Sequence, residues 1–488
     1  MTAGELHAAS VIEIADTVSS GRASAIEVTR AHLARIERHN RALGAYLHVD
    51  VQGALAQAAA VDRARSAGQP LGPLAGVPIG LKDNLCTAGV PTTCASRILE
   101  GYRPPYDAHV VERLRAASAV MLGKLNMDEF AMGSSNENSA YGPVRNPWDL
   151  ARAPGGSSGG AACATAARLA AATLGSDTGG SVRQPASFCG VTAIKPTYGR
   201  VSRYGLVAFA SSLDQIGPIA RDARDAARVL GAIAGHDPRD ATSVDRPVDD
   251  YEAECGKDVR GLRIGVLRSA LEGCDRAVVD AIEAALGRLT RMGCELCEVE
   301  LPYAEHAIAV YYIVATAEAS SNLARFDGMR YGLRVRGEDL RDTYSKTRQR
   351  GFGVEVKRRI MLGTYALSAG YYDAYYLKAQ KVRALICRDY ARAFERCDVV
   401  LGPTAPTPAF RLGEVKDPLS MYKQDIFTLP APLAGLPALS TPCGMAEHDL
   451  PLGLHMVAPA FEEARLFRLA HALEAGSGFP RAPADPEG

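Results

Sequence analysis

Gly155-Gly156-Ser157-Ser158-Gly159-Gly160 is the most informative segment of this chain, and a second Gly/Ser cluster, Asp177-Thr178-Gly179-Gly180-Ser181, follows closely. Glycines beside a serine let main-chain N–H groups point at a reacting oxyanion without obstruction by Cβ atoms. The segment between the clusters is mostly Gly and Ala, which predicts a central, closely packed helix over 158–169 and then a short strand over 172–176. A helix-like run over 182–190 would place Ser181 near a helix N-terminus, where negative charge is favoured.

Three other interpretations of the first cluster are open. Gly/Ser runs often form flexible loops. A phosphate cradle is a second interpretation, but no Gly-Lys-Ser/Thr follows and the chain has no GxGxxG. The third is the GxSxG turn of serine hydrolases, with His455 downstream as the general base. None of the three explains both serine clusters together with the lysine described next.

Lys82 follows the apolar run Val77-Pro78-Ile79-Gly80-Leu81, which suits a buried strand. A lysine acts as a base only when neutral, and at pH 7 to 8 this requires its pKa to fall by roughly 3 units, which burial can supply. Asp83, the next residue along a strand, is expected to face the opposite side. We expect Lys124, after the apolar run over 118–123, to reach out from a strand end.

At these three segments the sequence resembles the amidase signature family, which hydrolyses amides with a Ser–Ser–Lys triad. The resemblance implies that Lys82 is the base, that Ser157 bridges after a cis Gly156–Ser157 peptide, and that Ser181 is the nucleophile. It implies an oxyanion hole made by the N–H groups of Thr178, Gly179, Gly180 and Ser181. Asp177 is expected to order the turn, with Ser158, Arg183 and Gln184 as support.

Strand and helix patterns alternate along the chain, which predicts an α/β protein. The resemblance implies a single large amidase-signature domain over 1–475, with a mixed central β-sheet covered by helices on both faces. Within it we expect N-terminal helices over 5–40, with a Ser24–Glu27 capping box, and a linker-like loop over 235–261. Further helices are expected over 276–292, 305–326, 354–395 and 462–474, and strands over 262–267, 295–299, 398–401 and 438–441. The Pro/Gly/Ala-rich tail, 476–488, is predicted to be disordered.

Composition sets limits on partners and location. Lys plus Arg and Asp plus Glu number 55 each, so the chain has no net charge with which to hold nucleic acid by itself. The eleven cysteines are scattered, and the single CxxC, Cys294 and Cys297, has no second pair to complete a metal site. The N-terminus does not resemble a signal peptide, and no apolar run has transmembrane length. We expect a cytoplasmic protein with reduced thiols, no metal and no membrane association.

The later segments 190–218, 318–328, 357–363 and 421–425 resemble the A subunits of tRNA-dependent glutamine amidotransferases. The resemblance implies that the chain hydrolyses glutamine and passes ammonia through a tunnel to a B subunit, with a C subunit completing a heterotrimer. The B subunit would bind the misacylated tRNA, Glu-tRNA(Gln) or Asp-tRNA(Asn), and use ATP and Mg. No cofactor is expected in this chain.

A glutamine site needs a cation for the α-carboxylate and a carboxylate for the α-ammonium. The resemblance assigns these roles to Arg358 or Arg359 and to Asp425, with Tyr311 or Tyr312 nearby and Gly133 and Ser134 as further binding residues. Adjacent helix positions diverge by about 100°, so one arginine alone can face the site. Two alternatives stay open: the arginines and Asp425 form a structural ion pair, or the protein is a stand-alone amidase acting on a small amide.

Overall fold

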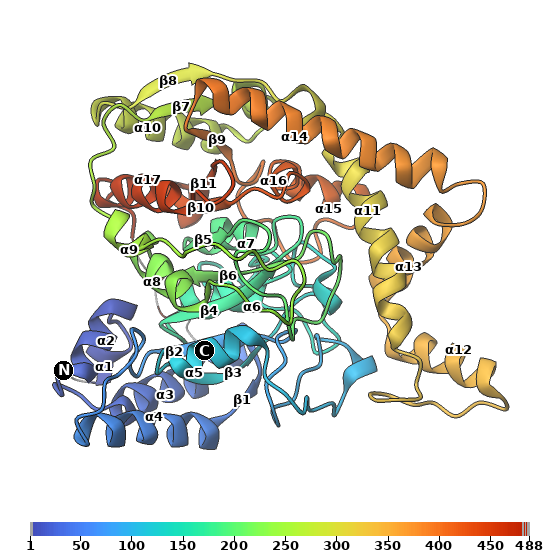
Figure 1. The fold of residues 1–488 in the computed structure, drawn as a ribbon, viewed down its shortest axis with the longest axis horizontal. Coiled ribbons are helices and arrows are strands. Elements are labelled where there is room, and N and C mark those ends of the chain that lie inside the picture. The colour runs from blue at the N-terminus through green and yellow to red at the C-terminus, as the bar shows by residue number, and fades with distance from the viewer. Residues whose placement is uncertain (1–2, 481–482, 484, 486–488) are drawn as a thin grey trace.

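The computed structural model describes residues 3–480, 483 and 485, and across these residues eleven strands form one sheet (Figure 1). The strand order is β1-β3-β2-β4-β6-β5-β10-β11-β9-β7-β8. β2 is parallel to β3 and β4, and β7 is parallel to β8 and β9; the other neighbours are antiparallel. The strands are β1 (Tyr46–Val49), β2 (Pro78–Lys82), β3 (Val120–Leu125), β4 (Ala172–Asp177), β5 (Thr192–Lys195), β6 (Gln215–Ala220), β7 (Arg263–Val266), β8 (Glu295–Glu298), β9 (Val399–Pro403), β10 (Ala438–Ala446) and β11 (Leu450–Val457).

Helices cover both faces of this sheet. Those of the first half are α1 (Ala3–Leu6), α2 (Val11–Ser19), α3 (Ala25–Leu43), α4 (Val51–Ser66), α5 (His109–Ala116), α6 (Gly159–Ala166), α7 (Arg183–Cys189) and α8 (Ala223–Ile233). Those of the second half are α9 (Tyr251–Glu254), α10 (Arg276–Arg291), α11 (Ala307–Asn322), α12 (Leu340–Gly351), α13 (Val354–Ala366), α14 (Lys378–Arg396), α15 (Pro418–Tyr422), α16 (Pro430–Leu433) and α17 (Glu463–Ala475). α6 and α7 pack on one face of the central strands, and α8, α10 and α17 pack on the other (Figure 1). The predicted α/β fold with a mixed, doubly covered sheet is confirmed.

The central helix α6 explains the Gly/Ala composition between the serine clusters. All of its residues are buried. A methyl group on Gly160 would lie 2.3 Å from the Asn126 carbonyl oxygen and 2.8 Å from that of Ala45, so no larger side chain fits there. Small residues therefore let this helix approach the neighbouring backbone and hold the first serine cluster in place.

A second hydrophobic core lies beneath α11, α13 and α14, apart from the core around the sheet. Phe130, Phe326 and Phe352 meet there, with ring centroids 4.9 to 6.2 Å apart. α11 and α13 lie side by side, and with α12 they extend from the body of the molecule, as does the far end of α14 (Figure 1). We call the unit formed by α11 to α14 the helical arm.

Several expected elements have different bounds in the structure. The helical region expected over 354–395 is divided, because α13 ends at Ala366 and a turn with a π-helical segment, Asp373–Leu377, precedes α14. The N-terminal region holds α1, α2 and α3, and both Ser10–Glu13 and Ser24–Glu27 form capping boxes. Residues 235–261 are irregular apart from α9. Of the tail expected to be disordered, 476–488, residues 481–482, 484 and 486–488 lie outside the described residues, while Phe479 packs its ring on Trp148.

Candidate active site

Lys82, the last residue of β2, lies at the centre of the site and is fully buried. Its ammonium group lies 2.8 Å from the hydroxyl oxygens of both Ser157 and Ser158, and 3.1 Å from the carbonyl oxygen of Ser176. Burial lowers the pKa of Lys82 to about 7, although nearby carboxylates, first among them Asp128, act in the opposite direction. A large fraction of this amine is therefore neutral near pH 7 and can accept a proton.

The other lysine singled out from the sequence, Lys124, does not reach out from its strand as expected. It is buried, because β3 is covered on both faces. Its Nζ donates to Thr92 Oγ1 over 2.8 Å and lies 3.6 Å from Asp83 Oδ1. Asp83 thus points away from Lys82, as the strand alternation predicts, and its charge is matched by Lys124.

The two serine clusters meet directly. The Ser158 N–H donates to the Ser181 carbonyl oxygen over 3.0 Å. The Gly156–Ser157 peptide is cis, as the resemblance implies. A methyl group on Gly156 would lie 2.0 Å from Asp128 Oδ2, which explains why glycine precedes the bridging serine. The Gln184 side chain accepts from the Gly156 N–H over 2.9 Å and donates to the Ser134 carbonyl over 3.0 Å.

The turn between β4 and α7 is held by the buried carboxylate of Asp177. It accepts hydrogen bonds from the Gly180 N–H at 2.8 Å and the Val182 N–H at 3.2 Å, and Arg183 binds both of its oxygens at 2.9 Å. This corrects one expectation, because the Gly180 N–H is already used inside the turn and does not face an oxyanion. The remaining candidate donors of the oxyanion hole are the N–H groups of Thr178, Gly179 and Ser181.

His455, the base required by the serine-hydrolase interpretation, does not contact a serine. It lies on β11, and its Nε2 is 2.7 Å from a terminal nitrogen of Arg183. Since arginine can only donate, Nε2 is the acceptor and the imidazole proton resides on Nδ1. Burial and the Arg183 charge hold the pKa of His455 well below its ordinary value. The GxSxG interpretation is therefore wrong, and Lys82 stands where a base would be needed.

The two adjacent arginines of α13 lie in different environments. Arg359 is buried and donates to Glu355 Oε1 over 2.7 Å, with its guanidinium 5.1 Å from the Tyr312 ring centroid and 5.4 Å from that of Tyr422. Arg358 pairs with the other oxygen of Glu355 but is only partly buried, with 40% of its side chain exposed. Arg359 is thus the arginine that faces inward. Glu355 and Tyr422 were not predicted; the i, i+4 spacing of Glu355 and Arg359 was the available signal.

Asp425 lies beside Gly180 of the turn that precedes Ser181. It is buried, accepts a hydrogen bond from Ser134 Oγ through Oδ2, and Oδ1 has no hydrogen-bond partner among the described residues. A methyl group on Gly180 would lie 3.4 Å from that free oxygen. Burial raises the pKa of Asp425 to about 7, and the Arg359 charge opposes the rise. A cation placed beside Oδ1 would therefore be stabilised.

The remaining predicted binding residues divide between these groups. Tyr311 touches the catalytic turn, since a methyl group on Gly179 would lie 2.8 Å from its Cζ. Tyr312 belongs to the Arg359 side and stacks on Tyr422 with ring centroids 3.7 Å apart. Gly133 packs behind the site, where a methyl group would meet the Asp128 carboxylate at 2.3 Å. Arg359 and Asp425 form no direct ion pair in the part of the chain that is described.

A triad of this kind on a doubly covered mixed sheet defines a class of amide hydrolases. The family model Amidase matches residues 27–467, and the chain belongs to that family. Over 479 residues it is 58% identical to the A subunit of glutamyl-tRNA(Gln) amidotransferase from Moorella thermoacetica, covering 98% of each chain.

Two solved structures are similar along almost their whole length. The crystal structure of the glutamyl-tRNA(Gln) amidotransferase A subunit from Thermotoga maritima is 43% identical, with a TM-score of 0.80, over 100% of this chain and 97% of that one. The native peptide amidase from Stenotrophomonas maltophilia is 33% identical, with a TM-score of 0.82, over 98% of each chain. The fold is thus shared by both relatives, while sequence identity is greater to the amidotransferase subunits.

Metal sites and membrane-spanning helices are absent from the described residues. No group of three or more His, Cys, Asp and Glu side chains there could hold a metal ion. Nor is any helix in that part of the chain long and apolar enough to cross a membrane.

Proposed function

We propose that this protein is the glutamine-hydrolysing A subunit of a tRNA-dependent amidotransferase. The observation that carries the proposal is the 58% identity to an A subunit of such an enzyme across nearly the full length of both chains. The site supports it independently, because the buried Arg359 guanidinium suits the α-carboxylate of glutamine and the unpartnered Asp425 oxygen suits its α-ammonium. Asp425 lies beside Gly180 of the catalytic turn that would hold the carboxamide, and Arg359 packs on Tyr312, the residue next to the Tyr311 that touches Gly179.

In the proposed reaction Lys82, in its neutral form, takes a proton from Ser157, which in turn takes the proton of Ser181. The Ser181 oxygen attacks the carboxamide carbon, and the N–H groups of Thr178, Gly179 and Ser181 bind the oxyanion. As the C–N bond breaks, the proton returns through Ser157 to the leaving nitrogen, which departs as ammonia. Water then attacks the glutamyl ester along the same proton path, releasing glutamate and restoring Ser181.

We propose further that the ammonia is consumed in a heterotrimer with B and C subunits, in the cytoplasm. The B subunit would bind the misacylated tRNA and use ATP and Mg, since this chain has no net charge for tRNA binding. An exposed patch on the helical arm supports a protein partner. It consists of Met361, Leu362, Tyr365, Tyr371, Tyr372 and Tyr375. Exposed aromatic and methionine side chains gathered in this way are typical of protein–protein interfaces.

Copurification tests the proposal. The tagged chain should bring down its B and C subunits in equal amounts, and the complex should amidate Glu-tRNA(Gln) or Asp-tRNA(Asn) with glutamine as the nitrogen source. The isolated chain should bind neither ATP nor tRNA tightly. A chain that associates with no B subunit, or that binds tRNA tightly alone, contradicts the amidotransferase assignment.

The peptide amidase relative supports a second candidate, a stand-alone amidase acting on a small amide. The two candidates differ in what stimulates them. Glutaminase activity that rises when misacylated tRNA is added together with the B subunit favours the amidotransferase. Fast hydrolysis of small amides, indifferent to those additions, favours the stand-alone enzyme.

A further inference from the structure

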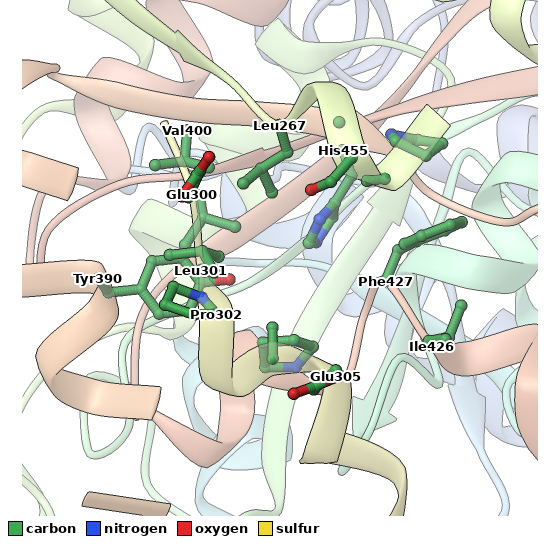
Figure 2. Close-up of a pocket in the computed structure, with 17 residues that line it drawn as sticks. Leu267, Glu300, Leu301, Pro302, Glu305, Tyr390, Val400, Ile426, Phe427 and His455 are labelled. Atoms are coloured by element: carbon green, nitrogen blue, oxygen red, sulfur yellow. The ribbon is translucent and has the colours of Figure 1, made fainter. Parts of the chain in front are cut away.

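A cavity of about 440 Å³ lies outside the carboxyl ends of β7 and β9, away from the serines. Its walls come from the residues that follow β7 and β8, from β9 itself, from the 426–430 segment and from β11. Figure 2 shows Leu267, Leu301, Pro302, Ile426, Phe427 and His455 around it. The volume is within the range of small-molecule sites, and the lining is mostly apolar, as such sites usually are.

The topology explains why a cavity forms here. β7 connects through α10 to β8 on one side, and the chain then crosses back through the helical arm to β9 on the other side of β7. The loops after β7 and β9 therefore diverge. In open α/β sheets this switch in strand order is where ligands bind.

Two polar groups in the wall are open to the cavity and have no hydrogen-bond partner among the described residues. His455 donates nothing from Nδ1, because its one hydrogen bond uses Nε2. The Tyr390 hydroxyl has none either, although the residue is only 2% exposed. A donor that faces a cavity in this way is free to bind a ligand, so a ligand that supplies an acceptor to Nδ1–H would gain a hydrogen bond there.

The charged residues that line the cavity indicate which charge a ligand should carry. Glu300 and Glu305 are its charged residues, both are exposed, and no Lys or Arg belongs to the described wall. This arrangement favours a cation and disfavours an anion. The ligand class is therefore a small amine with an apolar body and an acceptor such as a hydroxyl or carbonyl oxygen.

The cavity lies next to the catalytic turn, but Ser157, Ser158 and Ser181 are not among the residues that line it. His455 contacts Arg183, which binds Asp177, which holds the Gly180 N–H. On the 425–430 segment Ile426 and Phe427 line the cavity, while Thr428 donates to the Gly179 carbonyl over 2.7 Å. We propose that this cavity is an effector site for a small apolar amine, whose acceptor binds His455 Nδ1–H and whose occupancy alters the catalytic turn through Arg183.

Phenylalaninol, which has an aromatic ring, a hydroxyl group and an ammonium group, is a suitable probe, with 3-phenylpropanoate as an anionic control of similar size. Calorimetry on the full chain should show one phenylalaninol bound per chain and at least tenfold weaker binding of 3-phenylpropanoate. Ala304→Trp fills the cavity from its wall and should weaken phenylalaninol binding at least tenfold. The double variant Glu300→Gln with Glu305→Gln should remove most of the preference for the cation.

Binding to Ser181→Ala saturated with glutamine separates this cavity from the active site, and phenylalaninol should still bind there. No binding at millimolar concentration, equal binding to Ala304→Trp, or one-for-one competition with glutamine would overturn the site. Saturating phenylalaninol should change kcat for glutamine hydrolysis at least twofold in the parent chain and leave Ala304→Trp unchanged. An unaltered kcat at saturation overturns the effector role. If the chain has no glutaminase activity, the proposed function is refuted. The binding measurements then still show whether the cavity is a ligand site.

Discussion

Lys82 and Ser157 are joined by a 2.8 Å hydrogen bond in a place where neither side chain is exposed to solvent. In the proposed mechanism Ser157 carries the proton between this shielded lysine and the nucleophile. Ser181, the proposed nucleophile, is slightly exposed and would be the serine that meets the substrate. This arrangement makes the roles of the three residues separable by substitution.

Ser181→Ala should abolish glutamine-driven amidation while leaving amidation with free ammonia intact, because the second reaction is placed in another subunit. The measurement is amide formation by the complex with each nitrogen source. Ser187→Ala changes a buried serine of α7, the helix that follows Ser181, outside the catalytic network; it is the control and should retain full activity. Surviving glutamine-driven activity in Ser181→Ala would move the nucleophile to Ser157 or Ser158.

The pH dependence of glutamine hydrolysis should follow the neutral form of Lys82. Because burial lowers its pKa to about 7, activity should fall about tenfold per pH unit below pH 7 and level off above it. Lys82→Arg keeps the positive charge but cannot deprotonate, so it should be as inactive as Lys82→Ala. A rate that is independent of pH between 5 and 7 would exclude the neutral-lysine mechanism.

Arg359→Lys should raise KM for glutamine roughly tenfold to a hundredfold, since a charged hydrogen bond contributes about 1.5–3 kcal/mol. Arg358→Lys is a matched control, because both arginines pair with Glu355 but the Arg358 side chain is 40% exposed and that of Arg359 only 3%. We expect less than a twofold change in KM for that control. Equal effects of the two substitutions on KM would mean that neither arginine contacts the substrate.

Gly180→Ala should lower kcat by about 10²–10³, the loss typical of a displaced oxyanion donor. The glycine has a φ of +147°, and an added methyl group would lie 2.2 Å from Thr428 Oγ1, so the turn must move. Gly231→Ala is the control, since nothing lies within 4 Å of its added methyl group. That substitution should leave kcat unchanged and stabilise α8 by up to about 1 kcal/mol.

Asp177→Ala should destabilise the fold by about 3–5 kcal/mol, because it leaves Arg183 charged and buried without its partner. Urea unfolding followed by circular dichroism measures the change. Asp280→Ala breaks the exposed pair with Arg276 and should cost less than about 0.5 kcal/mol. Similar losses in the two variants would contradict the structural role assigned to Asp177.

The parts of the site that lie on local motifs could be predicted from sequence. Lys82, Ser157 and Ser181 each stand in a short segment whose glycines or apolar residues fix the backbone, so their positions follow from the pattern. The choice between Arg358 and Arg359 depends on how α13 is rotated against Tyr312 and Phe209, residues far away in the sequence. No local sequence pattern predicts how the helix is rotated.

Other features of the site could not be predicted from the sequence, because the strands that carry them are buried on both faces. β11, Leu450–Val457, is entirely buried and contains Pro451 and Gly453, which weaken the pattern of a strand. The sequence therefore offers His455 as a candidate base, whereas in the structure this side chain packs on Arg183. The charge of Lys124 predicts exposure for a similar reason, since its partner Asp83 directly follows β2, a different strand from its own.

The helical arm has a consequence for how such proteins diversify. The arginine that would recognise the substrate belongs to α13, whereas the lysine and serines are fixed by β2, β4 and the helices packed on the central sheet. Recognition of the substrate carboxylate and the chemistry therefore reside on separately replaceable pieces of one polypeptide. A lineage can acquire a new amide by remodelling the arm while its reaction centre is inherited unchanged.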